Sequence, residues 1–354
     1  MKMTLRWFGK DHDSVSLEHI RQIPGVTGVV TSLLDIPVGD IWSLEEIMER
    51  KLEVESYGLK IEGIESVNIH ENIKLGLPSR DKYITNYIET IKNLSKADIH
   101  LICYNFMPVF DWTRSDLAKR LEDNSTVLSY EATLVENIDP MVMVSEMEAK
   151  SSGYSLPGWE PERLKDIKVL FDAYKEVSEE DLFENLKYFL KAIIPACEKY
   201  DVKMAIHPDD PPWPIFGLPR IMNCEKNIDL LLEMVDSPYN GLTLCTGSLG
   251  ANKANDIPKL IRKYGNRIHF AHIRNIKFHE GRDFDESAHL SSKGSLDMYE
   301  IMKAYHEIDF QGIMRPDHGR MIWDEVARPG YGLYDRAIGA SYLLGLSEAI
   351  DKLK

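Results

Sequence analysis

Strand-like and helix-like runs alternate along the whole 354-residue chain, and eight such pairs are visible. This repeat predicts a parallel sheet with helical crossovers, and eight units predict a closed barrel. Apolar residues keep helical spacing at, for example, 43–58, 84–96, 179–200 and 333–350. The predicted strands cover residues 4–9, 27–33, 60–67, 98–105, 202–207, 241–246, 267–273 and 312–317. The sequence therefore predicts an α/β fold of the (β/α)8 (TIM barrel) class.

Two segments interrupt the repeat. The longer segment, about 106–175, follows the fourth predicted strand and contains no self-contained set of elements. We therefore expect an excursion from a single catalytic domain spanning 1–354, serving as a lid or a subunit contact. The second segment, 275–295, follows the seventh strand and is rich in His, Asp, Glu and Ser. Both segments are predicted to overhang the mouth of the barrel.

Charge and composition exclude several classes of protein. The chain has 57 acidic and 42 basic residues, a formal net charge of -15, which disfavours a nucleic-acid partner. No apolar run approaches the ~18 residues of a membrane span, and charges interrupt the first residues too early for a signal peptide. The four cysteines lack a C-x-x-C spacing. We expect a cytoplasmic protein with no membrane partner and no disulfide framework.

Potential metal ligands close four consecutive predicted strands, the fifth to the eighth. They are His207, Cys245, His272 and Asp317. Because barrel active sites lie at the carboxyl ends of the strands, these four side chains are expected to converge. Nitrogen, sulfur and carboxylate donors around one divalent ion would leave a position open for substrate or water. The pattern predicts a catalytic metal site.

Each of these four residues also has a structural interpretation. A single histidine at a strand end is more often simply hydrogen-bonded, and a buried free cysteine commonly acts as a small apolar residue. Asp317, within RPDHGR, is equally typical of a turn. The joint placement at one end of four successive strands favours the metal hypothesis over four separate structural roles.

Further candidates surround this predicted site. His318 and Tyr331 have side chains suited to moving protons, although His318 could instead orient Asp317 and Tyr331 could be buried structure. Arginine suits a substrate carboxylate, and Arg315 flanks the last ligand. Surface arginine is the usual alternative. The candidates for substrate binding are Arg6, Trp7, Asp209, Arg274 and Arg320.

The chain resembles the mannonate dehydratase family in order along nearly its whole length. The segments that carry the resemblance are HPDDPPWPIFGLPRI (207–221), LTLCTGSLG (242–250), HFAHIRNIKFHE (269–280), RPDHGR (315–320) and GYGLYDRA (330–337). The resemblance implies a barrel of the xylose-isomerase-like kind and a lyase that converts D-mannonate to 2-keto-3-deoxy-D-gluconate and water in hexuronate (glucuronate) catabolism. It also implies the four metal ligands above, His318 and Tyr331 as the acid/base pair, and a homodimer or larger homo-oligomer.

The sequence leaves alternatives open for the identity of the metal and for the reaction. The resemblance implies manganese or ferrous iron, whereas a thiolate with two imidazoles suits zinc at least as well. An aldose-ketose isomerase or epimerase on the same barrel would also use a metal and a proton shuttle. A phosphodiesterase acting on abasic DNA is disfavoured by the net charge. A catalytically silent binding protein would tolerate alanine at the ligand positions.

Overall fold

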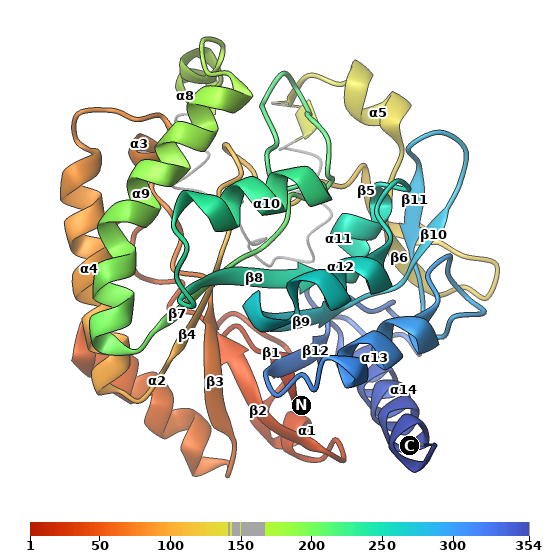
Figure 1. Cartoon of the computed structure of the whole chain (residues 1–354). Coiled ribbons are helices and arrows are strands. Elements are labelled where there is room, and N and C mark those ends of the chain that lie inside the picture. The colour runs from red at the N-terminus through yellow and green to blue at the C-terminus, as the bar shows by residue number, and fades with distance from the viewer. Residues whose placement is uncertain (141, 144–148, 150–166, 354) are drawn as a thin grey trace.

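A closed barrel of eight parallel strands forms the centre of the structure, a computed structural model that describes residues 1–140, 142, 143, 149 and 167–353 (Figure 1). The order around the barrel is β1-β12-β9-β8-β7-β4-β3-β2, which confirms the predicted fold class. Each strand overlaps a predicted run, although β1, β2 and β8 begin one or two residues earlier than predicted. The bounds are β1 Lys2–Arg6, β2 Val26–Thr31, β3 Lys60–Glu65, β4 Leu101–Tyr104, β7 Lys203–Ile206, β8 Asn240–Cys245, β9 Ile268–Ile273 and β12 Ile313–Pro316.

Helices surround the barrel and connect successive strands. Those of the repeat are α1 (Leu17–Arg21), α2 (Leu44–Ser56), α4 (Arg80–Lys96), α9 (Glu179–Tyr200), α10 (Glu225–Met234), α12 (Ile257–Tyr264), α13 (Met298–Glu307) and α14 (Leu333–Lys352). Shorter elements lie in the connections: α3 (Glu71–Lys74), α5 (Ala132–Asn137), α8 (Ile167–Tyr174), α11 (Thr246–Ala251) and the 3-10 turn Gly265–Arg267. Among these described helices, none is both long and apolar enough to cross a membrane.

Local sequence sets the ends of the outer helices. Ser43 accepts a hydrogen bond from the backbone N–H of Glu46 at the start of α2, and the Glu46 side chain accepts from the N–H of Ser43. Ser178 and Asp181 form the same reciprocal cap on α9. Such caps satisfy N–H groups that have no partner within the helix and commonly contribute about 1 kcal/mol. These caps therefore fix where α2 and α9 begin.

Burial explains why the barrel strands are rich in apolar residues. Every residue of β8 and β9 is buried, because the helices cover one side of the strand and the barrel interior takes the other. The interior of the barrel holds a cluster of Val30, Leu101, Cys103, Ala205, Phe270 and Ile313. The barrel is thus a packed core, and polar chemistry is confined to its rim.

The two interruptions of the repeat meet in a second, four-stranded sheet of order β10-β11-β6-β5. The longer one supplies β5 (Asp116–Arg120) and β6 (Thr126–Tyr130), and the other supplies β10 (Ile276–Phe278) and β11 (Phe284–Glu286). β11 pairs antiparallel with β6, and β10 lies against α11, beside the barrel in Figure 1. These strands were not predicted from the sequence. Residues 141, 144–148 and 150–166 of the predicted excursion lie outside the described residues.

Candidate metal centre and active site

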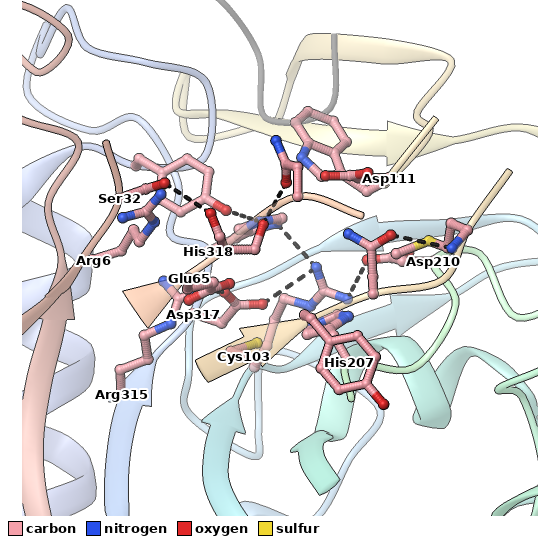
Figure 2. Close-up of a pocket in the computed structure, with 18 of the residues that line it drawn as sticks. Arg6, Ser32, Glu65, Cys103, Asp111, His207, Asp210, Arg315, Asp317 and His318 are labelled. Atoms are coloured by element: carbon pink, nitrogen blue, oxygen red, sulfur yellow. Dashed lines mark hydrogen bonds and ion pairs between the residues drawn. The ribbon is translucent and has the colours of Figure 1, made fainter. Parts of the chain in front are cut away.

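The four predicted ligands converge on one rim of the barrel, and we call His207, Cys245, His272 and Asp317 the rim cluster. Cys245 and His272 are register partners in neighbouring strands, and Asp317 and His207 directly follow β12 and β7. One nitrogen, sulfur or oxygen atom from each residue lies within 4.8 Å of the others. A pocket opens at this rim, and Figure 2 shows that His207 and Asp317 approach it from different sides. This arrangement could hold a metal ion.

The rim cluster carries strong negative charge. Burial alone would raise the pKa of the Cys245 thiol, but the nearby guanidinium of Arg274 lowers it to about 5. Burial likewise opposes ionisation of Asp317, yet His318 and Arg315 hold its pKa well below its usual range. The Cys245 sulfur and an Asp317 oxygen are 3.7 Å apart. Two negative groups at this distance repel unless a cation lies between them.

Two histidines offer ring nitrogens to the rim cluster. The Nδ1 atom of His207 is 2.7 Å from the carbonyl oxygen of Pro208, which can only accept, so Nδ1 carries the proton and Nε2 is left for the cluster. His272 is fully buried, and among the described residues its Nδ1 has no hydrogen-bond partner. A buried nitrogen without a partner is costly unless something else binds it. The residues of the rim cluster therefore fit a divalent cation.

A second group, Glu65, Cys103 and His272, also has the spacing of a metal site. A guanidinium already occupies this side, because Arg315 donates from Nη2 to Glu65 Oε1 at 2.9 Å and from Nε to His272 Nε2 at 3.2 Å. Burial and the nearby charge of Glu65 raise the pKa of Cys103 well above its usual value, which keeps it a thiol. These features favour the rim cluster as the metal site.

His318 and Tyr331 lie beside the rim cluster and contact each other. The Tyr331 hydroxyl is 3.0 Å from His318 Nε2, and both residues line the same pocket. A backbone hydrogen bond of 2.8 Å from Gly319 to Gly330 brings the two ends of their loop together, and Gly330 has a φ of +79 that favours glycine. Burial, and then the charge of Asp317, raise the pKa of Tyr331 above its ordinary value. Tyr331 therefore keeps its proton at neutral pH.

The arginines that line the pocket differ in their partners. Arg274 bonds Asp210 at 2.8 Å and Glu286 at 3.1 Å, and Arg315 bonds two carboxylates. Arg6 instead donates to the main-chain carbonyls of Trp7 and Val30, at 3.2 and 3.3 Å. Among the described residues, no carboxylate lies within salt-bridge distance of Arg6, which is only 4% exposed. Arg6 is a buried cation that faces the pocket without an ion-pair partner.

Three candidates for substrate binding do not line the pocket. Trp7 packs in the core and donates from Nε1 to the Val15 carbonyl at 3.1 Å. Asp209 accepts from the backbone N–H of Met222 at 2.8 Å and so closes the loop after β7. Arg320 pairs with Asp335 at 2.9 Å. Of the five candidates, the structure brings Arg6 and Arg274 into the pocket.

Sequence reasoning missed three charged residues of the site, Glu65, Arg114 and Glu286, and it expected Asp210 beside His207 without giving it a role. Asp210 receives both terminal nitrogens of Arg114, at 2.8 and 2.9 Å. Glu65 closes β3 as the predicted ligands close theirs, so the same strand-end rule could have identified it. Arg114 and Glu286 come from the second sheet and its flank, where the sequence carries no comparable signal.

Comparisons with known proteins agree with one family over the full chain. The family model for D-mannonate dehydratase (UxuA) matches residues 1–354. The chain is 60% identical over 356 residues to a mannonate dehydratase of Thermotoga neapolitana and 62% identical over 353 residues to that of Brachyspira hyodysenteriae, covering 100% of this chain and 99% of each relative. The crystal structure of mannonate dehydratase from Streptococcus suis is similar, with 46% identity, a TM-score of 0.90, and coverage of 100% of this chain and 95% of that one.

Proposed function

The chain belongs to the D-mannonate dehydratase family and is a lyase that removes water from D-mannonate, and we propose that it does so with a divalent cation held by the rim cluster. One observation carries the proposal: four metal-binding side chains lie within 4.8 Å of one another beside the His318–Tyr331 pair. Manganese is the first choice, as the resemblance in sequence implies. Ferrous iron and zinc are the alternatives, because a thiolate ligand suits them at least as well.

Dehydration has two requirements, removal of the proton at C2 and departure of the hydroxyl at C3. The C2 proton lies beside a carboxylate, so its removal adds negative charge to an anion. When bound, the divalent cation supplies positive charge at the substrate oxygens and offsets this cost. Hydroxide is a poor leaving group, so the C3 oxygen needs a proton from a general acid. The enol that results becomes the keto acid by tautomerisation.

His318 and Tyr331 are proposed to share these two proton transfers. Their side chains line the pocket beside Asp317, which is where the reacting carbons would lie next to the cation. Tyr331 holds its proton at neutral pH because burial raises its pKa, which suits a proton donor. The 3.0 Å contact between the hydroxyl and His318 Nε2 allows one group to restore the protonation of the other after turnover.

We assign the substrate carboxylate to Arg6. Its guanidinium has lost water through burial, which lowers its pKa to about 10, and among the described residues no carboxylate pairs with it. The nearest counter-charge, Glu65, is already paired with Arg315, so a buried cation at Arg6 gains from an anionic ligand. The other pocket arginines, Arg274 and Arg315, are already neutralised by protein carboxylates. Arg6 therefore distinguishes a sugar acid from a neutral sugar.

Replacing Arg6 by methionine is expected to raise KM for D-mannonate by ~10–100-fold, because a hydrogen-bonded ion pair of about 1.5–3 kcal/mol is lost. Arg6→Lys should recover part of this loss. Inhibition by the neutral D-mannonamide should be little affected, since it lacks the charge that Arg6 would bind. Steady-state kinetics give KM and the inhibition constant.

Arg320→Met is the matched control, because Arg320 lies outside the pocket and pairs with Asp335. A larger rise in KM for Arg320→Met than for Arg6→Met would contradict the assignment.

Removal of bound metal tests the cation directly. Protein stripped by a chelator should lose keto-acid formation from D-mannonate, and reconstitution with manganese should restore it. Parallel samples reconstituted with ferrous iron, magnesium and zinc rank the metals by the activity they restore. A panel of sugar acids and neutral sugars defines the substrate range. Semicarbazide detects the keto acid. Full turnover by protein that contains no metal would refute the proposal, whereas activity only on neutral sugars would favour an isomerase.

Three further expectations complete the proposal. We propose that the enzyme acts in hexuronate catabolism and forms a homodimer or larger homo-oligomer, as the resemblance implies. Sedimentation of the purified chain would measure the assembly. A cytoplasmic location is supported by four cysteines that are all free thiols, one of them in the rim cluster. Growth of a deletion strain on glucuronate tests the pathway.

A further inference from the structure

We infer that Glu286, from the second sheet, is a positioning residue that fixes the orientation and tautomer of His318. The inference rests on the proposed acid/base role of His318. Glu286 is the last residue of β11, is 2% exposed and is not among the residues that line the pocket. It lies behind His318, so it would act on the substrate only through that histidine.

The contacts of His318 define its orientation. Its Nδ1 is 2.7 and 2.8 Å from the two carboxylate oxygens of Glu286, and its Nε2 is 3.0 Å from the Tyr331 hydroxyl. Burial by itself would raise the pKa of Glu286, but His318 and Arg274 hold it below its usual range, so the carboxylate is ionised and can only accept. Nδ1 therefore carries the proton, and Nε2 faces the pocket as the atom available for proton exchange.

Arg274 approaches the same nitrogen and has to be considered as a competing partner. Its Nη1 is 3.0 Å from His318 Nδ1 and 3.1 Å from Glu286 Oε1. A guanidinium never accepts a hydrogen bond, so it cannot receive the Nδ1 proton. Both groups instead donate to the same oxygen, which explains why they lie close together. Arg114 adds a third donor to Glu286 Oε1 at 2.8 Å and helps to fix the carboxylate in place.

The position of Glu286 depends on the pairing of two distant parts of the chain. Phe284 and Asp285 of β11 pair with Tyr130 and Ser129 of β6 (Figure 1). Arg114, just before β5, joins Glu286 to Asp210 after β7. The second sheet thus connects the long excursion to the acid/base pair. Its role is to complete the catalytic site, in addition to covering the rim.

Replacement of Glu286 by glutamine tests the inference, because it keeps the size of the side chain and removes its charge. We expect kcat to fall ~10–100-fold, with KM and bound metal nearly unchanged. The matched control is Asp285→Asn, the same chemical change one residue earlier on the opposite side of the strand, where Asp285 binds Lys119 and His279. If Glu286→Gln unfolds, Glu286→Asp keeps the charge for both arginines and withdraws the carboxylate from Nδ1.

A double-mutant cycle separates positioning from general support of the fold. In a His318→Asn background, adding Glu286→Gln should change kcat by less than ~2-fold, because there is no imidazole left to orient. Additive losses, or an equal fall in kcat for Asp285→Asn, would show that Glu286 only stabilises the sheet. If Glu286→Gln has a normal kcat while His318→Asn has lost most of its kcat, this inference alone is overturned. Full turnover in His318→Asn overturns the acid/base role and this inference together.

Discussion

Asp317→Ala is expected to lose its bound metal, and its turnover should fall in parallel by at least ~100-fold. The carboxylate is the one hard oxygen donor in the rim cluster, and a cation at substrate oxygens contributes several kcal/mol to catalysis. The measurement is metal per chain by mass spectrometry, alongside keto-acid formation. Asp317→Asn serves as the control for packing, since alanine also removes one ion-pair partner from each of Arg315 and Arg274. Full activity with stoichiometric metal in Asp317→Ala would show that the ligand assignment is wrong.

The two cysteines at strand ends offer a matched pair that separates the two possible metal groups. Cys245 belongs to the rim cluster and Cys103 to the group with Glu65, and both are buried free thiols. Cys245→Ser should lower metal affinity and activity, because serine is neutral at working pH. Cys103→Ser should keep its metal, since Cys103 is a protonated thiol that accepts a hydrogen bond from Thr243 at 3.1 Å. The reverse result would move the metal to the second group.

Tyr331→Phe should reduce turnover by ~10²–10⁴-fold while keeping both the fold and the bound metal. Phenylalanine preserves the ring, which packs edge-on against Phe8 with centroids 4.9 Å apart, and removes only the hydroxyl that contacts His318. His318→Asn should behave in the same way if His318 moves protons. A histidine that merely orients Asp317 would instead weaken metal affinity by ~10–100-fold. Bound metal and kcat, measured on both variants, distinguish these roles.

Exchange of the C2 proton with solvent assigns the two roles. A variant that has lost the general acid but keeps the base should incorporate deuterium at C2 of D-mannonate in D2O without forming keto acid. A variant that has lost the base should do neither. Unimpaired dehydration by Tyr331→Phe, or activity in His318→Asn restored by excess manganese, would remove the acid/base assignment for that residue.

The periodicity of the sequence was sufficient to predict the barrel and the common rim of the four strand-end residues. Parallel strands with helical crossovers place every carboxyl end on one side, so residues far apart in sequence meet without further information. Seven of the eight strands were predicted one to four residues too long, because apolar runs continue into buried loops such as Trp7 and Phe8 after β1. Glu65 satisfied the same strand-end rule and was overlooked.

The interaction partners of individual side chains could not be predicted from the periodicity of the sequence. Arg6, Arg274 and Arg320 are equivalent in the sequence, yet one faces the pocket without a carboxylate, one is neutralised there and one pairs with Asp335 outside it. Asp209 and Asp210 are neighbours, and only Asp210 lies in the pocket. The direction of each side chain depends on which charges approach it from other elements.

The sequence by itself determined the fold class, the rim that carries the candidate site and the side chains that close its strands, because these follow from local periodicity and from the geometry of parallel strands. Only the tertiary structure decided which residues surround the proposed acid/base pair. Glu286 reaches His318 because β11 pairs with β6, about 150 residues earlier in the chain, and Arg114 arrives from the flank of the same sheet. Contacts between segments so far apart depend on the register of antiparallel strands in two irregular excursions, for which the local sequence has no periodic signal.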